Sequence, residues 1–523
     1  MESYLADLEQ SGLSREWGDA CLQAGKELQK QWQKWGIEAA RRDAPLDGYI
    51  YWTLVDVGKP SAQGLFDPFW QPKASTPEFF IRHNGETAVL AELGDDPPIL
   101  GEGGTLNVTW IVSHFGAEPI DARLRWKLVA NGKPLAKGES GPLHVAPGSV
   151  VDAGSDAIVM PRLKSAVKAQ LTAQLAGTGI RNSWDVWLFP EVAESENGAL
   201  FVRKMTVEAL DRLAEGGTVV VTDLSGSGPG YTPGWWGMGA QAGTAIDAGH
   251  PLFERFPADT YMTEVFHRLL GQSERLADTS YRGATPLMVT QGAAGYLAHL
   301  LEARAGNGKL LACGLDLTGG TVESRYLREE ICRYVDSPDF RPAGQIDLAA
   351  TRAELAAREA FRAEANGWSE TLQAPERDLY NSPFGQFGIV LCRATDGMQE
   401  TAWRTAPVPA DVDQDGEFTF MWLGLTGWRD QPEGTFTLWL GDRELVELGW
   451  TGEDREWSSE DGLVRLAFEV QEIIVSGQDS VGPMRLTLPA AWLTPGEPAT
   501  LRVTGSDSNT RRWFGLYEFP PPE

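Results

Sequence analysis

The sequence predicts a multidomain protein that joins α/β units to β-sandwiches. Its 523 residues exceed the roughly 250–300 residues at which a single hydrophobic core stops growing, so three or four domains are expected. The 58 glycines and 32 prolines, set among many short apolar runs, indicate abundant strands and turns. The apolar pattern also switches along the chain between helical spacing and alternation, which separates regions of different structure.

The first region, residues 1–92, opens with a predicted helix over residues 18–42. Apolar side chains recur there near helical spacing, with Lys and Glu between them. The turn signal Asp47-Gly48 follows, and residues 49–55 form a nearly continuous apolar run, which is typical of a parallel strand buried on both faces. One helix and one such strand cannot bury themselves, so we expect their neighbours to lie upstream of Met1.

The second region, residues 93–190, is expected to be an antiparallel β-sandwich of the immunoglobulin type. Residues 105–112 and 122–129 alternate apolar and polar side chains, and Asn131-Gly132 between later strands is a hairpin turn signal. The sequence Asn-Ser-Trp-Asp-Val-Trp over residues 182–187 closes this region.

The third region, residues 191–340, alternates strands with helices and predicts an α/β domain with a largely parallel sheet. Its expected elements are helices at 206–213 and 324–335 and strands at 218–222 and 309–315. Residues 341–370 are predicted to be a helical connector, because residues 348–366 are rich in Ala, Glu and Arg with alternating charges.

The last region, residues 371–523, returns to β-patterning and predicts a second β-sandwich, of the jelly-roll type. Twenty tryptophans are an unusual number. Each either fills a sandwich core or presents its indole face to a sugar ring. Trp428 is expected in a loop and is the best candidate for an exposed sugar platform, so the domain is a candidate for carbohydrate binding. Trp439 is expected to be core.

Charge and cysteine content exclude several functions. The formal net charge of -28 argues against nucleic-acid binding, which needs clustered Lys and Arg, and disfavours anionic membrane surfaces. The sequence contains no run of eighteen consecutive apolar residues, so it predicts no membrane-spanning helix. The four cysteines form no Cys-x-x-Cys pair, so neither a metal site nor a cofactor is expected from them.

A run of acidic residues mimics the start of a calcium loop, with Asp411, Asp413 and Asp415 before Gly416. An EF-hand needs a carboxylate at its twelfth position. That position is Trp422 here, so a solvated hairpin is favoured and no metal is predicted.

Three short elements in the first region carry a family resemblance. Residues 46–56 contain Trp52 and, four residues later, Asp56; residues 64–67 read Gly-Leu-Phe-Asp, and residues 71–73 read Gln-Pro-Lys. In order and spacing these elements resemble the eighth barrel strand, and the segment after it, of family 2 glycoside hydrolases, the β-galactosidase and β-glucuronidase family. The resemblance implies that residues 1–92 are the C-terminal end of a TIM barrel. It also implies a retaining enzyme of β-glycoside hydrolysis, with an oligo- or polysaccharide as its partner.

The resemblance places Trp52 and Asp56 at the C-terminal end of a barrel strand, where barrel active sites lie. It implies that Trp52 walls the sugar-binding site; barrel core is the alternative for this side chain. Retaining glycosidases also need two carboxylates about 5 Å apart, which the family takes from its fourth and seventh strands. Glu2 falls in the window for the nucleophile, but no strand precedes it. The catalytic residues are therefore unassigned, and we expect the chain to be inactive alone.

A second resemblance concerns the third region. Residues 249–253, Gly-His-Pro-Leu-Phe, resemble a motif of the glutamine-amidotransferase-like domains attached to some galactosidases. A working amidotransferase needs a cysteine on a strand-to-helix elbow with a histidine partner. Cys313 and Cys332 do not stand in that context, and neither His250 nor His267 has an assigned cysteine. We therefore expect an inert structural or oligomerising domain, which leaves a homo-oligomer open.

Two functions compete on the sequence alone. The first is the C-terminal portion of a glycoside hydrolase, and the alternative is a non-catalytic carbohydrate-binding or scaffolding protein. Seven further barrel strands encoded immediately upstream would discriminate between them. The sequence assigns no compartment; an extracellular or periplasmic location would follow if the full-length protein carries a signal peptide.

Overall fold

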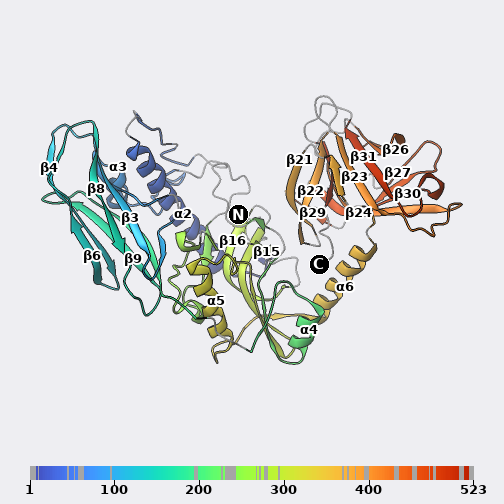
Figure 1. Cartoon of the computed structure of the whole chain (residues 1–523), viewed down its shortest axis with the longest axis horizontal. Coiled ribbons are helices and arrows are strands. Elements are labelled where there is room, and N and C mark those ends of the chain that lie inside the picture. The colour runs from blue at the N-terminus through green and yellow to red at the C-terminus, as the bar shows by residue number, and fades with distance from the viewer. Residues whose placement is uncertain are drawn as a thin grey trace.

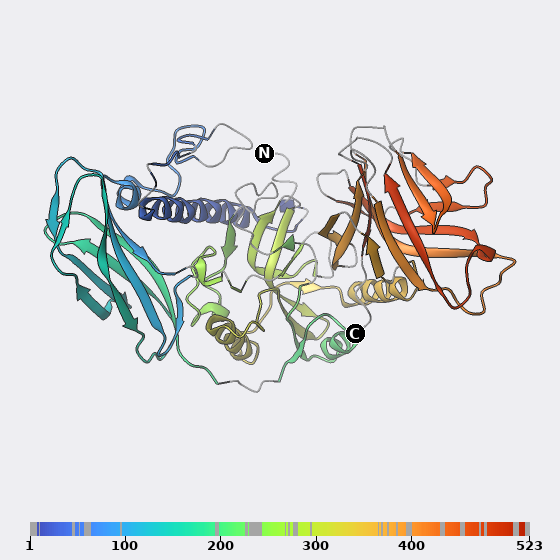
Figure 2. The same cartoon turned by 45° about the horizontal axis from the view of Figure 1, so that its top comes forward.

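The computed structural model describes residues 8–517, apart from residues 10, 44–45, 47, 52, 57–63, 95–96, 194–197, 225–227, 230–242, 267, 270–271, 276–280, 293–294, 365, 368–369, 374–375, 383–384, 394–399, 429–434, 450–455, 470–471, 475–478 and 506–511. Within these residues the protein is mostly β-structure with few helices. Figures 1 and 2 show a β-sandwich, a central α/β unit and a second β-sandwich arranged in a row. The expectation of a multidomain, β-rich protein is confirmed.

Helix α2 (Arg15–Arg42) confirms the first predicted helix and begins at Arg15 rather than at residue 18. It runs along both the first sandwich and the central unit (Figure 2). Near its start, Cys21 and Ala24 belong to the core of the central unit, and near its end Glu38 and Arg41 bond to the first sandwich. Helix α3 (Pro77–Asn84) is capped by Thr76 and packs against α2 and the first sandwich.

The first sandwich consists of a three-stranded and a five-stranded sheet, with a small two-stranded sheet beside them. In spatial order the strands are β1 (Thr87–Glu92), β3 (Thr105–His114) and β8 (Ser149–Val159); then β2 (Ile99–Gly101), β10 (Arg181–Phe189), β9 (Val167–Leu175), β5 (Leu124–Ala130) and β6 (Lys133–Glu139); and finally β4 (Ile120–Ala122) with β7 (Leu143–Val145). The indole of Trp110 lies 6.0 Å from that of Trp126 in the core between the sheets. The predicted β-sandwich is confirmed.

The hairpin signal of this sandwich is also confirmed. Asn131 and Gly132 join β5 to β6 with φ values of 47° and 73°. A two-residue hairpin turn of type I′ requires positive φ at both central positions, which Asn and Gly tolerate best.

The central unit is built on a nine-stranded sheet with the path β11-β12-β18-β17-β15-β13; β14 pairs with β16, and β16 and β19 pair with β17. Its elements are β11 (Leu200–Val202), α4 (Val207–Ala214), β12 (Thr218–Val221), β13 (Gly228–Pro229), β14 (Thr244–Ile246), the 3₁₀ turns η1 (Pro251–Phe253) and η2 (Glu264–Phe266), β15 (Gln272–Arg275), β16 (Thr285–Gly292), β17 (Gly295–Ala305), β18 (Gly308–Cys313), α5 (Val322–Val335) and β19 (Gln345–Ile346). The four elements predicted for this region correspond to α4, β12, β18 and α5, and all four are confirmed.

The prediction of a largely parallel sheet is wrong for this unit. Strands β11, β12 and β18 are parallel, but β14 to β18 pair with one another antiparallel. The physical reason is the length of the links. Ala305 pairs with Gly308 across the β17–β18 turn, and so short a link cannot contain the crossover that parallel neighbours require.

Helix α6 (Leu348–Glu364) confirms the predicted connector helix and leads into the second sandwich (Figure 1). Arg352 on α6 pairs with Asp211 on α4 at 2.6 Å. The second sandwich is antiparallel throughout its described pairings, which confirms the predicted β-sandwich. One sheet contains β20 (Glu370–Gln373), β23 (Glu400–Pro407), β31 (Pro498–Gly505), β25 (Thr435–Leu440) and β26 (Arg443–Gly449), and the other contains β21 (Glu376–Ser382), β22 (Gly385–Arg393), β32 (Arg512–Tyr517), β24 (Glu417–Trp428), β30 (Asp479–Pro489), β28 (Arg465–Phe468), β27 (Glu456–Ser458) and β29 (Glu472–Ile474), with the 3₁₀ turn η3 (Ala490–Trp492) after β30.

The buried strand predicted at residues 49–55 is not formed. The described residues of this stretch belong to no strand of a sheet, and Val55 makes an isolated bridge to Phe66. Ile50 is 93% exposed and Leu54 is 53% exposed. A strand needs neighbours to satisfy its backbone groups and bury its side chains, and this stretch has no sheet partner among the described residues.

Among the residues that the structure describes, no helix is both long and apolar enough to cross a membrane. Within the same residues no three His, Cys, Asp or Glu side chains are grouped so as to hold a metal ion.

Candidate functional site

The three sequence elements of the family resemblance converge on Asp56. The side chain of Asp56 is 8% exposed. One carboxylate oxygen pairs with Lys73 Nζ at 2.6 Å, and the other accepts the backbone N–H of Gly64 at 2.7 Å. Elements that are separate in the sequence therefore form one structure, which we call the motif knot (residues 54–56 and 64–73).

Backbone hydrogen bonds complete the motif knot. The N–H of Asp56 donates to Phe66 O at 3.0 Å, and the N–H of Phe66 donates to Leu54 O at 3.1 Å. A Cβ atom on Gly64 would lie 2.6 Å from Asp56 N. Because that neighbour is backbone and cannot move aside, only glycine fits at the start of the Gly-Leu-Phe-Asp element.

The last residue of that element, Asp67, closes the turn that follows. Its Oδ1 accepts the backbone N–H groups of Phe69 and Gln71, both at 2.9 Å. Trp70 within this turn has a φ of 62°, which is uncommon for a large residue. The local bonds of Asp67 compensate for this conformation.

Helix α2 holds the motif knot against the rest of the chain. Gln29 donates from Nε2 to Gly64 O at 3.0 Å and accepts from Lys73 Nζ at 3.2 Å. Asp56, which the sequence places at a sugar-binding site, thus has both carboxylate oxygens bonded within the motif knot. Trp52 lies outside the described residues, as does Glu2.

The residues around the motif knot expose an unusual amount of apolar surface. Of the fourteen large apolar residues that are exposed in the described chain, nine precede residue 92. Seven of them form the set that we call the exposed apolar set: Leu46, Tyr49, Ile50, Leu54, Phe69, Trp70 and Ile81. Single exposed apolar residues are ordinary, but a gathering of large ones in one segment is typical of a surface that another protein segment covers.

The tryptophans of the second sandwich divide into two groups. Trp403, Trp422 and Trp457 are buried, and the rings of Trp403 and Trp422 meet edge to face at 5.7 Å. Trp439, which was expected in the core, is partly buried and donates from Nε1 to Thr504 at 3.0 Å. Trp428 is the last residue of β24, opposite Arg512, and so is not the loop residue that was expected.

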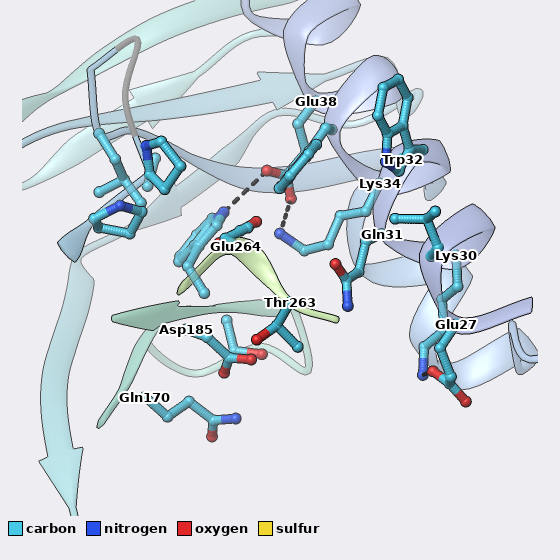
Figure 3. A pocket seen from close by; sticks show the side chains of 18 of the residues that line it. Glu27, Lys30, Gln31, Trp32, Lys34, Glu38, Gln170, Asp185, Thr263 and Glu264 are labelled. Carbon is cyan, nitrogen blue, oxygen red and sulfur yellow. Dashed lines mark hydrogen bonds and ion pairs between the residues drawn. The ribbon is translucent and has the colours of Figure 1, made fainter. Parts of the chain in front are cut away.

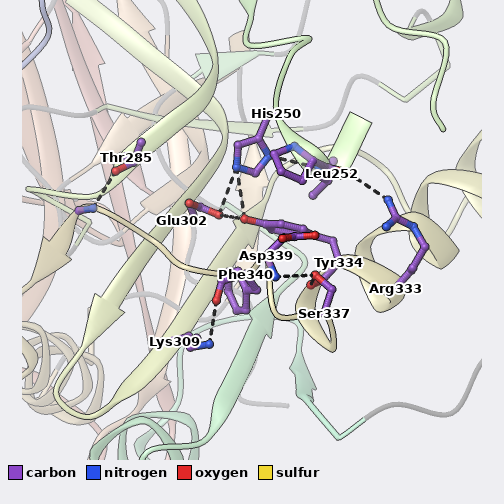
Figure 4. A network of polar contacts seen from close by, with 12 residues as sticks. His250, Leu252, Thr285, Glu302, Lys309, Arg333, Tyr334, Ser337, Asp339 and Phe340 are labelled. Carbon is purple, nitrogen blue, oxygen red and sulfur yellow. Dashed lines mark hydrogen bonds and ion pairs between the residues drawn. The ribbon is translucent and has the colours of Figure 1, made fainter. Parts of the chain in front are cut away.

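The histidine of the amidotransferase-like motif has oxygen partners. His250 Nε2 lies 3.2 Å from the Tyr334 hydroxyl, which donates to the buried Glu302 carboxylate at 2.7 Å (Figure 4). Cys313 is fully buried, and this burial raises the pKa of its thiol to about 12. The thiol is therefore not a thiolate near neutral pH. His267 lies outside the described residues.

The acidic residues 411–416 form a turn between β23 and β24. Asp413 Oδ1 accepts the N–H of Asp415 at 3.1 Å, and Asp413 O accepts the N–H of Gly416 at the same distance. The aspartate pattern is therefore used in a local turn of the backbone.

A cavity that the sequence did not predict lies where α2, the first sandwich and the central unit meet (Figure 3). We call it the junction cavity; its volume is ≈ 560 Å³. Lys34 and Gln31 of α2 face Thr263 and Glu264 of the central unit across it. Trp184, Asp185 and Trp187 also line it, and the motif at 182–187 was the one sequence signal for this place. No pattern in the sequence pointed to Glu264.

Comparisons with known proteins leave the family open. Residues 200–355 match a domain of unknown function (DUF8487), and residues 104–190 match another (DUF8488). No curated protein matches the sequence. The two matched segments coincide with the central unit and with most of the first sandwich.

Solved structures give only distant likenesses. The chain is similar to an alkylpurine DNA glycosylase of Pseudomonas fluorescens (11% identity, 20% of this chain and 30% of that chain, TM-score 0.17). It is similar to a cycloisomaltooligosaccharide glucanotransferase of Paenibacillus sp. (8% identity, 81% and 70%, TM-score 0.18). It is also similar to β-glucuronidase 2 of Bacteroides uniformis (8% identity, 90% and 35%, TM-score 0.16). The chain thus spans about a third of the length of the glycosylase and of the glucuronidase, and with TM-scores this low neither fold nor function follows from these likenesses.

Proposed function

We propose that these 523 residues act as the C-terminal, non-catalytic portion of a protein that hydrolyses β-glycosides with retention of configuration. The observation that carries the proposal is the motif knot. Asp56, Gly64 and Lys73 stand in three separate elements of the family resemblance, and they bond directly to one another. The elements of the resemblance thus form one hydrogen-bonded structure, which supports the proposal.

The exposed apolar set supports the same proposal. Residues 49–55 have the apolar composition of a buried barrel strand, yet Ile50 and Leu54 are largely exposed. Barrel strands that pair with this stretch would cover both side chains and satisfy its backbone. In the proposed enzyme these strands also bring the acid/base and nucleophile carboxylates, and Trp52 walls the sugar site beside them.

The central unit is proposed to be structural. His250 bonds to Tyr334 and stands near Glu302, and the buried Cys313 keeps its proton near neutral pH because burial raises its pKa. Amidotransferase chemistry requires a thiolate paired with a histidine. The described part of this unit offers packing and a helix-anchoring surface in place of that pair.

The test compares the 523-residue chain with the chain extended by the coding sequence immediately upstream. We expect the extended protein to hydrolyse chromogenic β-galactosides or β-glucuronides and the 523-residue chain to release no chromophore, since general acid–base catalysis alone contributes about 10²–10⁴-fold. Turnover by the 523-residue chain that survives purification would contradict the proposal, and so would an upstream sequence without barrel strands.

A further inference from the structure

The junction cavity is assembled from three parts of the chain that lie far apart in the sequence. Residues 27–42 of α2 form one wall, residues 183–187 of β10 form another, and residues 261–264 of the central unit form a third. Its volume of ≈ 560 Å³ lies within the roughly 300–1,000 Å³ of small-molecule sites. None of the motif-knot residues lines it, so it is a separate place on the molecule.

Charged groups of both signs line the cavity. Four carboxyl groups line it, from Glu27, Glu38, Asp185 and Glu264, and so do four cations, from Lys30, Lys34, Arg42 and Arg82. The pair Lys34–Glu38 is buried at 2.7 Å, and Lys30 pairs with Glu27 at 3.1 Å. A charged ligand that bonds to Lys30 or Lys34 would have to break these pairs, and a neutral one would not.

The Glu38 carboxylate is already bonded to three partners. Its carboxylate accepts Trp184 Nε1–H at 2.9 Å and Asn182 Nδ2–H at 2.7 Å, in addition to the pair with Lys34. It therefore fixes the wall of the cavity. The other polar side chains that line the cavity are those of Gln31, Gln170, Ser183, Asp185, Thr263 and Glu264.

Two of these groups are carboxyls whose pKa values are raised above their ordinary ranges. Burial and the nearby charge of Asp185 raise the pKa of Glu264 to about 8, against the lowering effect of Lys34. Burial also raises the pKa of Asp185, against the lowering effect of Lys168. Near neutral pH the protonated Glu264 can both donate and accept a hydrogen bond, as a hydroxyl-bearing ligand requires.

Aromatic faces provide the rest of the lining. Trp35 is 39% exposed and lines the cavity, and Trp184 lines it with Lys34 Nζ 4.9 Å above its ring. The negative face of an indole attracts the slightly positive C–H groups of a flat ligand. A purely apolar ligand would bury the carboxyls without partners, which is costly.

We propose that the junction cavity binds a short neutral saccharide of one or two rings. The aromatic side chains contact the C–H faces of the sugar, and the uncharged polar groups bond to its hydroxyls. The site would make α2 sensitive to sugar, because the ligand touches this helix, the first sandwich and the central unit together. It is independent of the hydrolytic activity proposed above.

The experiment titrates the full 523-residue chain with lactose and with cellobiose, followed by calorimetry, with glucuronate as the charged probe. We expect a neutral disaccharide to bind with a dissociation constant on the order of 1 mM and glucuronate to bind at least about ten-fold more weakly. Trp35→Ala should weaken disaccharide binding about ten-fold. The matched control is Trp70→Ala, which removes a tryptophan that is 66% exposed and outside the cavity, and it should change nothing.

The pH profile provides a second readout that does not depend on how well the tryptophan variant folds. A neutral ligand that displaces water raises the pKa of Glu264 further, so affinity should stay constant from pH 5 to about pH 7 and fall above about pH 8. The groups that influence Glu264 are Asp185, Lys34, Glu38 and Trp35, and Glu264→Gln should flatten the profile. Disaccharide affinity that rises with pH would mean that binding prefers the ionised form of Glu264 and would overturn the proposal, as would the absence of binding by both disaccharides at tens of millimolar. Retained binding by a folded Trp35→Ala chain would place the sugar elsewhere and overturn it as well.

Discussion

Helix α2 and the segment that follows it, residues 46–73, belong to the same predicted barrel end but meet very different surroundings. Helix α2 is tied into two units of the chain, through Cys21 and Ala24 in one core and through Glu38 and Arg41 on the first sandwich. The following segment holds itself together in the motif knot and leaves Ile50 and Trp70 largely exposed. This difference shows that the sequence pattern determines where an apolar face lies, and that the available partners determine whether that face is buried.

Among the variants proposed here, Glu38→Ala should lower the free energy of unfolding most, because it removes contacts that anchor α2. This change leaves Lys34 as a buried unpaired cation and removes the acceptor of Trp184 and Asn182. Breaking a buried pair in this way costs about 3–5 kcal/mol, which denaturant unfolding followed by tryptophan fluorescence would measure. The control is Glu27→Ala, whose pair with Lys30 is more exposed and should contribute at most about 1 kcal/mol. Equal losses in the two variants would mean that Glu38 does not anchor α2.

A smaller effect is expected from Glu264→Gln, and it depends on pH. The folded state raises the pKa of Glu264 to about 8 because of burial, whereas the unfolded value is about 4.3. The protonated form is thus favoured on folding: its stabilisation is fully present below about pH 4 and is lost as the pH rises through about 8. At pH 9 the variant should be more stable than the wild type by about 1–3 kcal/mol, and near pH 4 the two should coincide. Parallel stability curves from pH 4 to pH 9 would contradict the buried carboxyl.

Asp56→Asn should act on the motif knot and spare α2. The neutral amide weakens the bond to Lys73 Nζ, and a charged hydrogen bond of this kind contributes about 1.5–3 kcal/mol. We expect chymotrypsin to cut faster at Phe69 and Trp70, by about ten-fold, with no new cuts within Arg15–Arg42. Asp461→Asn, in an exposed turn of the second sandwich, serves as the control. Cleavage of α2 at the same rate as the segment would show that the two regions do not differ.

The smallest effect on stability is expected from Trp428→Ala. We propose that Trp428 binds glycan, so the variant should lose retention on polysaccharide gels while its melting temperature stays close to that of the wild type. Trp403→Ala is the contrasting variant, because Trp403 is fully buried and such a truncation costs about 3–5 kcal/mol. If Trp428→Ala unfolds the second sandwich, or if the wild type is retained on no glycan of a broad panel, the platform does not exist.

Elements that depend on short-range interactions were predicted from the sequence, and elements that depend on long-range contacts were not. Helix α2, the hairpin at Asn131-Gly132 and strands β12 and β18 depend on local spacing and turn chemistry, and all were predicted. The prediction of a strand at residues 49–55 was wrong because strand pairing depends on neighbouring strands, and a local sequence pattern does not show whether they are present. The prediction of a largely parallel sheet in the central unit was wrong because apolar runs look alike in parallel and antiparallel sheets.

The same distinction between local and long-range contacts applies to the candidate sites. The motif elements were found because Asp56, Gly64 and Lys73 lie close together in the sequence, but their mutual bonds needed coordinates. The junction cavity was signalled only by the motif at residues 182–187, since Glu38 and Glu264 stand on elements more than two hundred residues apart and neither is unusual locally. Trp428 was misplaced because its neighbouring glycine and charged residues resemble a loop, while the register of β24 with β32 extends the strand to its position.

The decisive measurement is hydrogen exchange along two proteins, the 523-residue chain and the same chain extended by its upstream coding sequence. We expect amides of α2 to be equally protected in both proteins, because the partners of this helix lie within the chain. We expect amides of residues 49–55 to exchange freely in the 523-residue chain and to become protected in the extended protein, where barrel strands pair with them. Protection of residues 49–55 in the shorter chain, or free exchange in both proteins, would contradict the proposal that this segment completes a barrel.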